Sequence, residues 1–153
     1  MSAWIQFYGL LFVGIILIPN IFFTMTHKEG FQNLYQNRVV ECAEQIGRVG
    51  CFGLMIVTPP VLCRGFWFPG AKTAYIIAGF LLTALYCLGW MVFWRENSIR
   101  KALVLSILPS ILFLESGILL LHIPLIVFAV LFAICHITIS YQNAAIEKRQ
   151  IHS

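Results

Sequence analysis

Long apolar stretches, separated by short polar ones, fill most of this chain. The five stretches are Trp4–Met25, Val49–Cys63, Ala71–Trp94, Ala102–Leu121 and Leu125–Tyr141. Because about 20 helical residues cross the roughly 30 Å hydrocarbon core of a bilayer, stretches of this kind indicate transmembrane helices. The pattern predicts an all-α membrane protein, a bundle of five transmembrane helices in one domain that covers residues 1–153. The predicted spans are about 4–25, 44–63, 71–94, 102–121 and 125–141.

The second stretch is shorter than the others. The 15 residues of Val49–Cys63 would give roughly 22 Å of helix at about 1.5 Å per residue, and Pro59-Pro60 bends or ends it early. A complete crossing therefore needs the residues before it, so the predicted span starts at 44. From Phe31 to Ile46, apolar residues recur close to helical spacing with polar residues mostly on other faces. This predicts a cytoplasmic amphipathic segment before span two.

Basic residues are divided unevenly between the two sides of the predicted spans. Eight fall on one side, and only Arg64 and Lys72 fall on the other. Cytoplasmic loops of membrane proteins carry an excess of lysine and arginine, so this division predicts an N-out, C-in topology. The eight residues on the predicted cytoplasmic side are Lys28, Arg38, Arg48, Arg95, Arg100, Lys101, Lys148 and Arg149.

Composition narrows the classes of function. Apolar residues make up 60% of the chain and charged residues 10%, which excludes a water-soluble globular domain. The formal charge of +4 lies mostly on one predicted side, which indicates contact with membrane lipids and not with nucleic acid. The five cysteines have no CxxC spacing and are expected to pack as small apolar residues. No metal-ligand motif is present, and no cofactor is indicated.

A polar face leads into the second span. Glu41, Glu44, Gln45 and Arg48 are spaced i, i+3, i+4 and i+7, so they share one face of a helix. If this face lies at the membrane interface, Arg48 extends to the head groups. If it faces the bundle, a buried Glu44–Arg48 pair marks a site. An adjacent face carries small residues that suit close helix packing, namely Ala43, Gly47 and Cys51.

Glu115 is the only acidic residue deep inside an apolar stretch. An ionised carboxyl group is costly there, so we expect it to be protonated or hydrogen-bonded and to point into the bundle, towards span three or span five. Ser116, Thr83 and Tyr86 are the expected neighbours. The alternatives are a functional site and a protonated glutamate with a structural role.

Two further polar residues are predicted to lie at the depth of Arg48. His136 is near the inner end of span five, and Asn20 follows Pro19 in span one. Together with Glu44 and Arg48 they form a hypothetical cluster on the cytoplasmic side, although a histidine among apolar residues also serves simply for packing. The candidate intramembrane polar site therefore comprises Glu115, Glu44, Arg48, His136 and Asn20.

Three segments carry a resemblance to other proteins. The segments 41–53, 106–117 and 123–136 read ECAEQIGRVGCFG, SILPSILFLESG and IPLIVFAVLFAICH. Together they resemble a family of small multi-span membrane proteins of low-GC Gram-positive bacteria that has no assigned activity. The resemblance covers nearly the whole chain. It implies a multi-pass protein of the bacterial cytoplasmic membrane and supplies no catalytic residues.

Three functional hypotheses follow. In the first, the protein binds or helps move a small or lipophilic solute, as a homo-oligomer or beside a partner membrane subunit, and is not an enzyme; a cavity that reaches Glu115 would favour it. In the second, it is a membrane enzyme acting at the cytoplasmic interface, with Glu44 or His136 as an acid–base group and Arg48 holding a phosphate or carboxylate. A cleft lined by Arg48 and His136 would favour this second hypothesis. In the third, it is a structural or regulatory subunit, with a solid bundle and an exposed groove of small residues.

Overall fold

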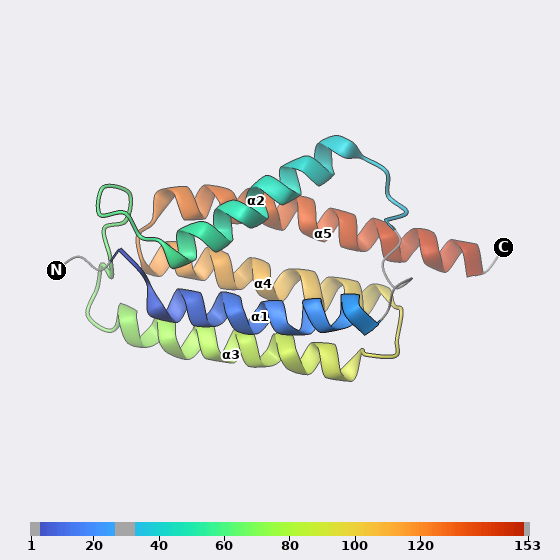
Figure 1. Ribbon diagram of the computed structural model, residues 1–153, viewed down its shortest axis with the longest axis horizontal. Coiled ribbons are helices and arrows are strands. Elements are labelled where there is room, and N and C mark those ends of the chain that lie inside the picture. The colour runs from blue at the N-terminus through green and yellow to red at the C-terminus, as the bar shows by residue number, and fades with distance from the viewer. Residues whose placement is uncertain (1–3, 27–32, 152–153) are drawn as a thin grey trace.

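The protein folds into five α-helices. The computed structural model describes residues 4–26 and 33–151. Figure 1 shows the helices as an elongated bundle with the two ends of the chain at opposite ends. In chain order they are α1 (Phe7–Thr26), α2 (Arg38–Ile56), α3 (Ala71–Val92), α4 (Ile99–Leu119) and α5 (Ile123–Ile151).

Four helices, α1, α3, α4 and α5, are long and apolar enough to cross a membrane. Their outward faces carry large exposed apolar side chains such as Ile18, Phe22, Val127 and Ile134, which suit contact with lipid acyl chains. The prediction of an all-α, multi-span membrane protein is therefore confirmed. α2 is not among these four helices.

Two isolated backbone bridges fix the direction of the chain. Ile5 pairs with Val57, and Cys63 pairs with His122. The start of α1, the end of α2 and the turn between α4 and α5 therefore gather at one end of the bundle, which we call the N end. α2 thus runs back along the bundle from the opposite end, the C end, and crosses α5 obliquely (Figure 1).

The boundaries of α2 differ from the predicted ones. The helix ends at Ile56, so the predicted span 44–63 is wrong as a continuous helix, because Pro59 and Pro60 interrupt it. At its other end, α2 begins at Arg38, where the Asn37 side chain accepts hydrogen bonds from two backbone N–H groups. The described part of the predicted amphipathic segment before Asn37 is not helical, and Phe31 lies outside the described residues.

The last helix is longer than predicted. α5 continues to Ile151, beyond the predicted end of span five at 141. The segment after Tyr141 is more polar, yet it contains neither glycine nor proline and includes good helix formers such as Ala144 and Glu147. Apolarity therefore ends before the helix does, and α5 extends past the other helices (Figure 1).

Glycines allow α2 to approach its neighbours closely. A Cβ atom on Gly47 would lie 2.9 Å from the backbone of Phe132 in α5, and one on Gly50 would lie 2.5 Å from the Phe128 ring. These distances are too short for any side chain, so the α2–α5 contact depends on glycine. The predicted packing role of Gly47 is confirmed.

α2 exposes several large apolar residues, beside the polar Arg38 and Gln45, and buries a charged one. Val39, Ile46 and Val49 are exposed, whereas Glu44 is only 3% exposed and faces the bundle. A helix on a water-soluble surface has the reverse arrangement. The polar face of α2 is therefore turned inward at Glu44, and this residue is the natural starting point for a site.

Candidate functional site

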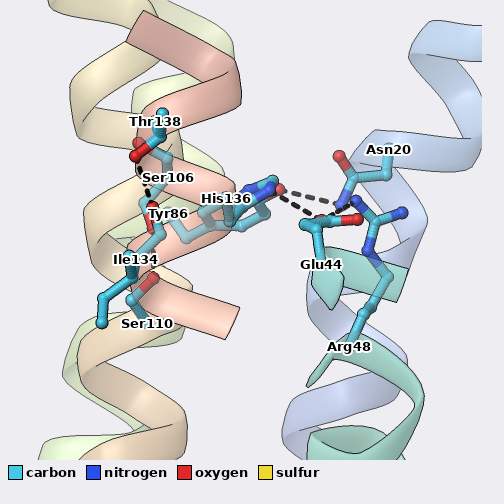
Figure 2. Close-up of polar contacts among 9 residues, drawn as sticks. All are labelled: Asn20, Glu44, Arg48, Tyr86, Ser106, Ser110, Ile134, His136 and Thr138. Atoms are coloured by element: carbon cyan, nitrogen blue, oxygen red, sulfur yellow. Dashed lines mark hydrogen bonds and ion pairs between the residues drawn. The ribbon is translucent and has the colours of Figure 1, made fainter. Parts of the chain in front are cut away.

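Glu44 lies at the centre of a polar cluster between α2 and α5 (Figure 2). Its Oε1 atom forms an ion pair with Arg48, one helical turn further along α2. The same oxygen lies 2.9 Å from Nδ1 of His136 in α5. The structure thus brings three of the five candidate residues into direct contact, two from α2 and one from α5.

The contact with Glu44 constrains the tautomer of His136. When the Glu44 carboxylate is ionised it can only accept hydrogen bonds, and His136 Nδ1 is then the donor. In the neutral imidazole, Nε2 is then a hydrogen-bond acceptor. The ring itself is held by stacking on Phe132, with ring centroids 4.5 Å apart and an angle of 19° between the planes. Glu44 therefore fixes the tautomer, and Phe132 fixes the plane of the ring.

Asn20 takes part in a separate contact. Its side-chain nitrogen donates to the Tyr86 hydroxyl at 2.8 Å and to the Ile16 carbonyl oxygen at 2.9 Å. The first of these bonds joins α1 to α3. Asn20 therefore lies beside the Glu44 cluster, but its hydrogen bonds are to Tyr86 and to its own helix.

These polar groups line a cavity of about 740 Å³, which we call the α1–α2–α5 cavity. Polar residues and the aromatic rings of Phe52, Phe113 and Phe132 both line it. The polar lining includes Asn20, Glu44, Arg48, Tyr86 and His136, and the aliphatic lining includes Ile16, Leu17 and Ile139. The arrangement presents hydrogen-bonding groups and an apolar surface to the same space.

Glu115 lies apart from this cluster and lines neither the α1–α2–α5 cavity nor the smaller one described below. Both carboxyl oxygens are buried without a hydrogen-bond partner in the described part of the chain. None of the expected neighbours hydrogen-bonds to Glu115: Ser116 and Thr83 donate to carbonyl groups of their own helices, and Tyr86 accepts from Asn20. Glu115 is within electrostatic range of the Tyr75 hydroxyl group in α3.

Replacing Glu115 by methionine should stabilise the protein. A buried polar group without a partner costs about 1–3 kcal/mol, and methionine has a similar length without that cost. Thermal unfolding in detergent would measure the increase in the free energy of unfolding. The Glu115→Gln variant is the control, since it retains hydrogen-bonding groups and should stay close to the wild type. A loss of stability in Glu115→Met would show that the carboxyl group makes a favourable interaction.

A second buried histidine, His122, has a structural environment. It lies in the turn between α4 and α5, and its Nδ1 atom accepts a hydrogen bond from the Leu125 backbone at 3.3 Å. Burial lowers the pKa of His122 below its ordinary value, so the ring is neutral and can accept this bond. His122 therefore caps the start of α5.

The described residues contain no group of three histidine, cysteine, aspartate or glutamate side chains that could hold a metal ion. All five cysteines are free. The sequence did not single out Tyr86 as a partner of Asn20, nor Lys101, which was counted only among the positive charges. A lysine directly before an apolar stretch, in the first turn of the same helix, is the signal that could have drawn attention to Lys101.

No family model, curated protein or solved structure matches the chain. The resemblance noted in the sequence therefore identifies no family. What stands is a multi-span helical membrane protein, with a polar cluster built around Glu44.

Proposed function

We propose that the protein binds a small amphiphilic solute in the α1–α2–α5 cavity. The observation that carries this proposal is a cavity of about 740 Å³ whose lining combines polar and aromatic side chains. Its volume falls within the range of about 300–1,000 Å³ typical of small-molecule sites. Such sites are mostly apolar, with a few polar groups that orient the ligand. This is the first of the three hypotheses drawn from the sequence, that the protein binds a small solute, with the site at Glu44 and not at Glu115.

The polar lining residues favour a solute whose polar group both donates and accepts hydrogen bonds. The Glu44 charge is matched by Arg48 and by the His136 N–H group, so it needs no cation from the solute. His136 Nε2 can accept a hydrogen bond, and the remaining Arg48 N–H groups can donate. A solute with a hydroxyl, amide or carboxylic acid group and an apolar body can contact both the polar and the aromatic lining residues.

The experiment that tests this proposal fills the cavity. Leu17 lines it, whereas the adjacent Ile18 is 65% exposed and points away from the core. Leu17→Trp should abolish co-purification of the solute, and Ile18→Trp should leave it unchanged. Small molecules would be extracted from each protein after purification in mild detergent and measured by mass spectrometry. Equal amounts of the same compounds from wild type and Leu17→Trp would contradict the proposal.

A second candidate function, an enzyme acting at the membrane interface, is favoured by the cavity lining. Arg48 and His136 both line the cavity, which is the feature that distinguishes this hypothesis. A carboxylate that orients an imidazole is an arrangement used for general base catalysis. For an enzyme, His136→Gln should abolish turnover of the co-purified solute while its affinity changes little. Undiminished turnover in this variant would reject His136 as the base.

We also propose an N-out, C-in orientation in a bacterial cytoplasmic membrane, with α2 as a fifth crossing. The uneven division of basic residues supports the orientation. The exposed apolar residues Val39, Ile46 and Val49 support the placement of α2 in lipid. The C end of the bundle then faces the cytoplasm, and Glu44 lies near that side.

A further inference from the structure

A second cavity, of about 340 Å³, lies at the C end of the bundle, where the end of α3, the start of α4 and the last part of α5 meet. We call it the Lys101 cavity. It adjoins the α1–α2–α5 cavity, since Asn20, Tyr86 and His136 line both. Lys101 and Trp90 line only the smaller one.

Lys101 is buried without an ion-pair partner. The residue is 5% exposed, and of the residues whose placement is described no carboxylate lies within ion-pair distance of its ammonium group. Nζ lies 4.8 Å from the ring centre of Phe23 and 5.5 Å from that of Trp90. Ring faces attract a cation, but they leave the strong hydrogen bonds of an ammonium group unmade. Glu147 and Glu96 attract this charge from beyond ion-pair distance, and a buried charge of this kind is stabilised further by an anion in direct contact.

Trp90 supplies a second unsatisfied donor. It is 4% exposed, and its indole N–H makes no hydrogen bond of ordinary geometry among the described residues, although the Tyr86 hydroxyl group lies close enough to act as a weak acceptor. Ser98 and Lys101 also place the first turn of α4 against this cavity. The N-terminus of a helix carries a partial positive charge that favours anions. Two buried donors and a helix N-terminus therefore lie around the same small space.

Glu147 limits the charge of the anion. It is the acidic residue of the described lining, and its Oε1 atom accepts a hydrogen bond from Asn97 at 3.0 Å. Its carboxylate would repel a doubly charged phosphate more strongly than a singly charged phosphodiester. It could also accept a hydrogen bond from a hydroxyl group of an alcohol esterified to the phosphate.

We infer that the Lys101 cavity binds a phosphate group, with Lys101 as its cation and the Trp90 indole as a further donor. A singly charged phosphodiester of an anionic lipid head group fits this lining better than free phosphate does. The cavity lies at one end of the apolar helices, where head groups are found. This inference is independent of the proposed solute, because Lys101 does not line the α1–α2–α5 cavity.

The test measures the thermal stability of the purified full-length protein in an uncharged detergent. Short-chain phosphatidylglycerol, short-chain phosphatidylcholine and inorganic phosphate are titrated separately. Because a ligand that binds only the folded state stabilises it, phosphatidylglycerol should raise Tm in a saturable manner, and phosphatidylcholine should do so far less. Lys101→Met should weaken the apparent affinity about tenfold or more, as expected for the loss of a charge-assisted contact. A shift by inorganic phosphate alone would support the phosphate site and identify the free ion as its source.

Arg100→Gln is the matched control, because Arg100 is the adjacent cation and is exposed. It should retain the affinity of the wild type if Lys101, and not general positive charge, holds the phosphate. Trp90→Phe retains an aromatic ring and removes the N–H group, and it should weaken binding about threefold. If Lys101→Met does not fold, the affinity of Trp90→Phe still tests whether the phosphate binds in the Lys101 cavity. Equal Tm shifts in Lys101→Met and wild type, unchanged affinity in Trp90→Phe, or no shift with any phosphate compound would overturn the inference.

Discussion

Replacing Arg48 by alanine should destabilise the protein by about 3 kcal/mol, because it leaves the buried Glu44 carboxylate without its cation. His136 would still donate one hydrogen bond, so the carboxylate would not be wholly unpartnered. Glu44→Ala should cost less, since the side chain of Arg48 is 38% exposed and can be solvated. Urea or thermal unfolding in detergent would measure the difference between these two variants.

The double variant provides the decisive comparison. Arg48→Ala combined with Glu44→Ala should recover part of the stability lost in Arg48→Ala alone, since no carboxylate then remains buried. Arg38→Ala is the control, because Arg38 is an exposed arginine of the same helix and should change stability by less than about 0.5 kcal/mol. If Arg48→Ala behaves like Arg38→Ala, the ion pair is an exposed surface pair of little energetic value.

Replacing Gly9 by alanine should destabilise the protein by about 1–3 kcal/mol or more, because there is no space for a side chain. A Cβ atom at this position would lie 2.0 Å from the Met55 carbonyl oxygen of α2. The obstacle is backbone and not a flexible side chain, so α1 and α2 would have to separate. Thermal unfolding would show a lower Tm, and the change in helix spacing should also alter the accessibility of Cys51, which is fully buried between the helices.

Gly14 is a matched control on the same helix. A Cβ atom there would meet no other atom within 4 Å. Alanine favours the interior of a helix over glycine by roughly 0.5–1 kcal/mol, so Gly14→Ala should stabilise the protein slightly. The two substitutions are chemically identical and should have opposite signs. Similar effects at both positions would mean that α1 and α2 can be separated without cost.

Hydropathy predicted where the membrane helices lie, but not where they end. The apolar stretches located α1, α3, α4 and α5 correctly, because a bilayer requires long apolar helices. They did not predict that α5 continues to Ile151, since apolar residues indicate the membrane-spanning part of a helix and not its whole length. The apolar stretch up to Cys63 predicts a complete second crossing, whereas α2 ends at Ile56, because Pro59 and Pro60 follow within one turn.

The candidate site could be predicted only in part. Helical spacing placed Glu44 and Arg48 on one face of α2, because that relation is local. Their contact with His136 depends on how α2 crosses α5, which residue spacing does not specify. The Lys101 contacts with Phe23 and Trp90 are harder still, since they join residues from three helices. The apolar surroundings of Glu115 predicted its burial, but they could not specify that its carboxyl oxygens have no hydrogen-bond partner among the described residues.

Phe132 has a consequence for how substitutions combine. The Phe132 ring stacks on the His136 ring and packs edge-on against Phe113, and the Phe132 backbone lies against Gly47. A change at Gly47 that displaces Phe132 must therefore also turn the imidazole away from Glu44. The effects of substitutions at these positions are therefore not independent: the effect of a change at one position depends on which residues occupy the others. A substitution in this part of the cavity is therefore expected to change helix packing and the polar contacts of Glu44 together.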